Sequence, residues 1–186
     1  MSNPTQSVPV RWFIAVIAFP IGGFLGHLVG GPAATIPAAL ISGVIAGAII
    51  GVGQGFALNV RGQALLSWAA VTAIGLAAAL AAVTPFIGQI ATRREAATLG
   101  AVSGLALGAG QAAVLHRQYV RNSWIWIPAS AVAWGVGWFV TASIGVALEA
   151  GWPVYGLSGA LASQLITGIV IWRLTAARPA HLATAA

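Results

Sequence analysis

The chain has no cysteine and no aspartate, and its only acidic residues are Glu95 and Glu149. Without cysteine it can form no disulfide, no thiolate metal site and no cysteine nucleophile. The two glutamates lie far apart in the sequence, so they cannot form a pair of catalytic carboxylates, and a Ser-His-Asp triad has no aspartate to use. We therefore predict that the protein is not an enzyme.

Charge of either sign is scarce. Only 5% of the 186 residues are charged and 59% are hydrophobic, whereas soluble domains carry about 25% charged residues. Such a chain cannot cover a surface that faces water, so we predict an integral membrane protein. All eight basic residues are arginines at or between apolar segments, and no basic patch with interleaved aromatic residues occurs. This distribution argues against nucleic-acid binding, despite the net charge of +6.

Long apolar runs dominate the sequence. The hydrocarbon core of a bilayer is about 30 Å thick and needs roughly 20 apolar residues per helix. Short gaps between such runs favour antiparallel neighbours. We predict an all-α fold of six transmembrane helices in a compact bundle of hairpins, spanning residues 12–174 between a tail of residues 1–11 and a tail of residues 175–186. The runs are 12–30, 34–58, 64–86, 97–116, 124–147 and 153–174.

The arginines predict an orientation, because cytoplasmic loops retain Lys and Arg while acidic residues contribute little. Six helices place both tails on one side, and that side collects six of the eight arginines. The other side has Arg93 and Arg94, with Glu95 in the same loop and Glu149 near the end of the fifth helix. We predict a multi-pass protein of the cell (inner or plasma) membrane with both termini cytoplasmic. The six cytoplasmic arginines are Arg11, Arg61, Arg117, Arg121, Arg173 and Arg178.

Tryptophans near the ends of the runs fit this topology, since an indole at the interface can bury its ring and keep its N–H in water. Trp134 and Trp138 are exceptions, one turn apart inside the fifth run, where they can either pack the core or face lipid. The predicted interfacial tryptophans are Trp12, Trp68, Trp124, Trp126, Trp152 and Trp172.

The pattern GxxxGxGQ occurs twice, at residues 47–54 and 104–111. On a helix the first two glycines and the glutamine of each copy share one stripe. Small residues there let another backbone approach closely, and the glutamine can hydrogen-bond across the contact. Because the copies lie in helices of the same direction, they predict a parallel internal repeat of helices 2–3 and 4–5. The candidate packing or ligand-lining residues are Gly47, Gly51, Gln54, Gly104, Gly108, Gln111 and, in helix six, Gln164.

Two interpretations of these glutamines stay open. Gln54 and Gln111 can line a ligand cavity near mid-membrane, since an amide offers donors and acceptors to a substrate. They can equally bond to each other or to backbone and fix helix contacts, as is common in bundles without a ligand. We favour the second interpretation, and Gln164 follows the same choice.

Histidine and arginine supply the other candidates. His27 could ligate a haem or metal, but His116 is expected at a different depth and His181 in the tail, so we predict no metal and no cofactor. Four arginines at the predicted cytoplasmic ends of the helices can contact lipid phosphates or serve only as orientation signals. These arginines are Arg61, Arg117, Arg121 and Arg173.

Each GxxxGxGQ helix is followed, after a short basic loop, by an apolar helix led by tryptophan. This arrangement, over residues 43–76 and 100–138, resembles small, uncharacterised bacterial multi-pass membrane proteins. The resemblance implies no catalytic residue.

We predict a protein of structural or accessory type that packs through glycine-rich helix faces. The alternative is a permease-like subunit that binds a small solute or a lipid. A cavity lined by the glutamines would favour the permease-like alternative, and a solid core would favour the structural or accessory role. Expected partners are the lipid bilayer and either further copies of the chain or a larger membrane complex.

Overall fold

A computed structural model describes residues 8–87, 92–118, 120–145 and 157–176. It is all-helical across these residues, and six of its helical segments are long and apolar enough to cross a bilayer. The prediction of six membrane-spanning helices is therefore confirmed. Sequence-based expectations for Glu149, Trp152, Arg178 and His181 lie outside the described residues.

The first span is broken into three pieces, and the other spans are single helices or a helix with a short 3-10 start. Val8–Ile14 (α1), Ala15–Ile17 (η2) and Ala18–Gly30 (α2) form the first span. The remaining elements are Ile36–Ala57 (α3), Gly62–Ile87 (α4), Arg93–Arg117 (α5), Ser123–Ile125 (η3), Trp126–Ser143 (α6) and Leu157–Ala176 (α7).

Several spans differ from the apolar runs at their ends. The first begins at Val8 rather than residue 12, and the fifth ends at Ser143 rather than residue 147. The fourth begins at Arg93, so Glu95, predicted in a loop, lies in the first helical turn. Its carboxylate accepts the N–H of Thr92 at 2.9 Å, and the Thr92 hydroxyl accepts the N–H of Glu95 at 3.2 Å. This capping box satisfies helix-end donors and extends α5 beyond its apolar part.

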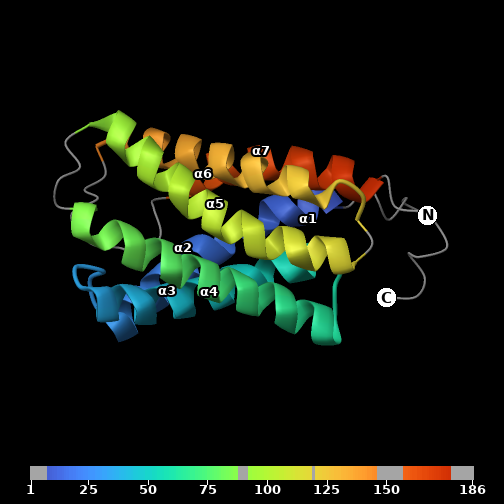
Figure 1. Ribbon diagram of the computed structural model, residues 1–186, viewed down its shortest axis with the longest axis horizontal. Coiled ribbons are helices and arrows are strands. Elements are labelled where there is room, and N and C mark those ends of the chain that lie inside the picture. The colour runs from blue at the N-terminus through green and yellow to red at the C-terminus, as the bar shows by residue number, and fades with distance from the viewer. Residues whose placement is uncertain (1–7, 88–91, 119, 146–156, 177–186) are drawn as a thin grey trace.

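The helices pack as sequential hairpins. Each span contacts the next one along the chain, and α7 returns to contact α1, so the last helix lies against the first (Figure 1). The tightest pairs are α3 with α4 and α5 with α6, the two hairpins that carry the GxxxGxGQ motifs. This arrangement directs the inner faces of all six spans toward one common core.

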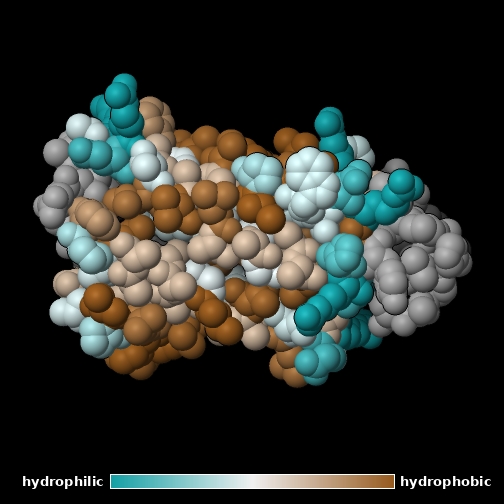
Figure 2. Space-filling model, in the orientation of Figure 1, coloured by the Kyte–Doolittle hydropathy of each residue, from teal (hydrophilic) through white to brown (hydrophobic). Residues whose placement is uncertain are grey.

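The outward face of the bundle is apolar. Figure 2 shows hydrophobic residues over the middle of the molecule and hydrophilic residues gathered toward its two ends. Large side chains such as Phe24, Leu28 and Ile74 are more than half exposed. Soluble monomers rarely expose apolar patches larger than a few hundred Å². The length of the spans and this belt together identify a multi-pass membrane protein.

The side on which each end of the bundle lies stays a prediction, and two exposed positions test it. Gln63 lies in the first turn of α4 at the arginine-rich end, and Arg94 lies in the first turn of α5 at the opposite end. We expect Gln63→Cys to resist an impermeant thiol reagent in intact cells and Arg94→Cys to react, because retained arginines mark the cytoplasmic side. The chain has no native cysteine, so background labelling is absent. The reverse pattern would invert the topology.

Candidate functional site

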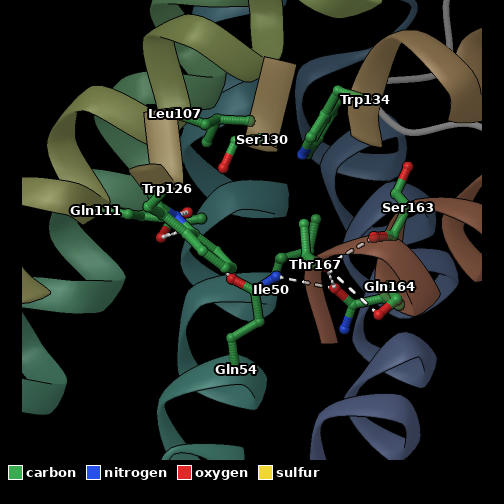
Figure 3. A pocket seen from close by; sticks show the side chains of 11 residues that line it. Ile50, Gln54, Leu107, Gln111, Trp126, Ser130, Trp134, Ser163, Gln164 and Thr167 are labelled. Atoms are coloured by element: carbon green, nitrogen blue, oxygen red, sulfur yellow. Dashed lines mark hydrogen bonds between the residues drawn. The ribbon is translucent and has the colours of Figure 1, made fainter. Parts of the chain in front are cut away.

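The three glutamines predicted as candidates meet in the core of the bundle. Gln54 of α3 donates through Nε2 to Oε1 of Gln164 on α7 at 3.3 Å. Gln111 of α5 donates through Nε2 to Oε1 of Gln54 at 3.2 Å. All three side chains are buried, and Figure 3 shows Gln54 between Gln111 and Gln164. The sequence grouped Gln164 with the other two as a packing or ligand-lining candidate, but it did not predict the hydrogen bonds that join them.

Side chains from the other spans extend this network. Gln111 Nε2 also donates to Oγ1 of Thr72 on α4 at 2.9 Å, and its Oε1 accepts the indole N–H of Trp126 on α6 at 2.8 Å. Gln164 Nε2 donates to the backbone oxygen of Trp12 on α1 at 2.9 Å. One connected set of hydrogen bonds therefore takes a residue from every membrane span.

The tryptophans correct an expectation. Trp12, Trp68 and Trp126, predicted at the membrane interface, are only 0%, 1% and 1% exposed. Their rings pack against one another with centroids 5.7–6.4 Å apart, within the usual range for aromatic pairs. Two of them find internal partners for their indole N–H, since Trp12 Nε1 donates to Oγ1 of Thr167 at 3.0 Å and Trp126 donates to Gln111. For these two, an internal acceptor takes the place of interfacial water, whereas Trp68 is buried although its indole N–H has no hydrogen-bond partner among the described residues.

The remaining tryptophans among the described residues fall into two groups. Trp124 and Trp172 are exposed, as expected for interfacial residues. Trp138 is buried, and Trp134 packs beside Phe19 with ring centroids 6.1 Å apart. Trp134 and Trp138 therefore pack in the core rather than face lipid.

The network leaves almost no free space. Between the glutamines, Trp126, Trp134 and Thr167 lies a cavity of about 10 Å³, roughly the room that one water molecule needs. The hydroxyl of Ser130 lines this cavity, is buried, and has no hydrogen-bond partner among the described residues (Figure 3). Chemically, the site offers neutral amides, hydroxyls and indoles, so it provides neither a nucleophile–base pair nor a buried charge.

The glycine stripes lie against neighbouring helices of the same chain. A Cβ added at Gly47 would lie 2.7 Å from the Cα of Ala73 on α4. A Cβ added at Gly108 would lie 3.1 Å from the Cα of Ile127 on α6. The first two glycines of each motif therefore pack against the partner helix of their own hairpin and bring the glutamine-bearing helices close to α4 and α6.

The other candidates lie apart from this core. His27 is on α2, and His116 is in the last turn of α5. No group of three His, Cys, Asp or Glu side chains lies together in the described part of the chain. The four arginines proposed for lipid contacts all lie at the end of the bundle where α3, α5 and α7 finish: Arg61, Arg117, Arg121 and Arg173.

Sequence reasoning missed Thr72, Thr167 and the buried tryptophans as network members. A usable signal existed, because Trp68 follows Gln54 at nearly the spacing at which Trp126 follows Gln111, and Thr72 and Ser130 each come one turn later.

No protein-family model, curated protein or solved structure matches the chain. The resemblance to small bacterial membrane proteins therefore stays a prediction, and function has to be argued from the site itself.

Proposed function

We propose that the protein is a structural or accessory component of the plasma membrane, without enzymatic activity and without a solute pathway through its core. The observation that carries this proposal is the closed polar network. The functional groups of the three glutamines bond to one another and to neighbouring helices. A glutamine that serves a ligand would instead present free donors and acceptors to an open space.

The size of the core supports the same proposal over its alternative. Sites for small molecules usually measure about 300–1,000 Å³, whereas the cavity beside the glutamines measures about 10 Å³. A permease-like subunit that binds a solute at these glutamines would have to break the network and separate the helices. The hydrogen bonds favour the helix-fixing role.

The contacts also support the proposed internal repeat. The α3–α4 hairpin contributes Gln54 and Thr72, and the α5–α6 hairpin contributes Gln111 and Trp126, to one network. Gln164 of α7 joins the same network and also donates to the backbone oxygen of Trp12 on α1. We infer that the contact of α7 with α1 closes the bundle across the two ends of the chain.

The occupied glycine faces restrict the expected partners. Since Gly47 and Gly108 are already packed within their hairpins, further copies of the chain or other membrane proteins must use the outward side chains. The accessory role therefore places partners on the lipid-facing surface and leaves the core as a rigid scaffold.

Flux through reconstituted vesicles tests this proposal. We expect vesicles with the protein to swell in glycerol, or take up labelled amino acids, no faster than protein-free vesicles, because about 10 Å³ admits neither solute. Stopped-flow light scattering and isotope uptake measure the two rates. A saturable flux that disappears in the Gln111→Leu variant would contradict the proposal and favour the permease-like alternative.

A further inference from the structure

The arginine-rich end of the bundle carries an open basin of about 790 Å³. It lies where the end of α5 passes into η3, and His116, Arg117, Val120, Arg121 and Asn122 line it. Its volume is comparable to that of small-molecule sites, about 300–1,000 Å³. Four of its five lining residues carry polar or basic side chains.

The floor of the basin is anchored to the core. The Val120 N–H donates to the backbone oxygen of Leu115 at 3.0 Å, and the Val120 side chain is 2% exposed within the cluster that includes Trp68 and Trp126. Arg117 and Arg121 flank this anchor and are exposed. The two guanidinium groups therefore lie on either side of Val120, whose backbone is fixed to the end of α5 by this hydrogen bond.

No nearby acid neutralises this charge in the described part of the chain. Arg11, Arg61 and Arg173 lie at the same end of the bundle, where hydrophilic residues gather (Figure 2). The one described acid, Glu95, lies at the opposite end of α5, about 33 Å from Arg117 at 1.5 Å per helical residue. The basin is therefore part of a surface with excess positive charge.

We propose that the basin binds the phosphate group of an anionic phospholipid headgroup. Arginine guanidinium groups match phosphate oxygens in a bidentate geometry, and His116 and Asn122 add donors beside them. A lipid fits better than a soluble phosphate because the basin lies where membrane spans end. Trp124, three residues after Arg121, is 65% exposed, and exposed tryptophans at span ends typically lie at headgroup level.

The chain provides a matched control for this site. Arg117→Gln with Arg121→Gln removes two charges from the basin, and Arg61→Gln with Arg173→Gln removes two charges from the same end outside its lining. We expect the first double variant to bind short-chain phosphatidylglycerol about 25-fold more weakly than the parent, at about fivefold per arginine. The second should change binding far less. Titration of the full-length protein in neutral detergent measures the affinity.

Two further arms distinguish the sources of phosphate and check the fold. Short-chain phosphatidylcholine should bind weakly, and glycerol phosphate, which lacks acyl chains, should not compete at concentrations that saturate the lipid. Both double variants should melt like the parent in neutral detergent, because all four arginines lie outside the polar core. Equal weakening by both double variants would show a general charge effect and overturn the site. Equally tight binding of glycerol phosphate would overturn the lipid source.

Discussion

Gly104→Ala should lower the melting temperature of the protein in detergent, although alanine is the better helix former in a free helix. A Cβ at this position would meet the backbone oxygen of Ser130 and lie 2.8 Å from the Cα of Ala131. Both contacts are backbone atoms of α6, which cannot rotate away as a side chain can. Overpacking of this kind costs about 1–3 kcal/mol. Gly47→Ala should behave alike, since its Cβ would lie 2.7 Å from the Cα of Ala73.

A larger substitution should give the larger effect. Gly104→Leu should abolish recovery of folded protein, because the leucine side chain would force α5 and α6 apart and remove their close contact. Ala109→Leu is the matched control, since this residue lies on the same helix at an exposed position. Size-exclusion profiles after stepwise heating measure the folded fraction. If Gly104→Leu and Ala109→Leu melted alike, the glycine face would be directed at lipid rather than at α6.

The number and approximate limits of the spans could be predicted from hydropathy, because a run of about 20 apolar residues has few stable alternatives to a membrane helix. The start of α5 could also have been predicted. Thr92 and Glu95 have the spacing of a capping box, but the three charged residues at 93–95 suggested a loop. Charged residues at the end of a span lie outside the apolar core of the membrane, but the helix can continue through them. A charged stretch is therefore easily mistaken for a loop.

The tryptophans could not be placed from sequence, because an indole is equally suited to the headgroup layer and to a core that offers an acceptor. Trp126 is buried because Gln111 accepts its N–H, and that acceptor comes from a different helix. The packing of α7 against α1 was equally hidden. An even number of spans places the two chain termini on the same side of the membrane, but it does not make the first and last spans neighbours.

Gln111→Met should destabilise the protein more than any other single change in the polar network. Gln111 donates two hydrogen bonds and accepts a third. The methionine would leave the Trp126 indole N–H without its acceptor and Thr72 without its donor. Interhelical bonds in membranes contribute about 0.6–2 kcal/mol each, and buried unpaired groups cost about 1–3 kcal/mol. We expect a loss of about 2–4 kcal/mol of unfolding free energy in total.

A double-mutant cycle separates the hydrogen bond from general packing. Trp126→Phe removes the indole N–H, so it should cost less in the Gln111→Met background than in the parent, with a coupling energy of about 1 kcal/mol. Gln63→Met removes the same amide from an exposed position at the start of α4 and should be nearly neutral. Unfolding in mixed micelles measures the four proteins of the cycle and the Gln63→Met control. If Gln111→Met were as neutral as Gln63→Met, the amide would not hold the helices together, and a role toward a ligand would become the better explanation of a buried glutamine.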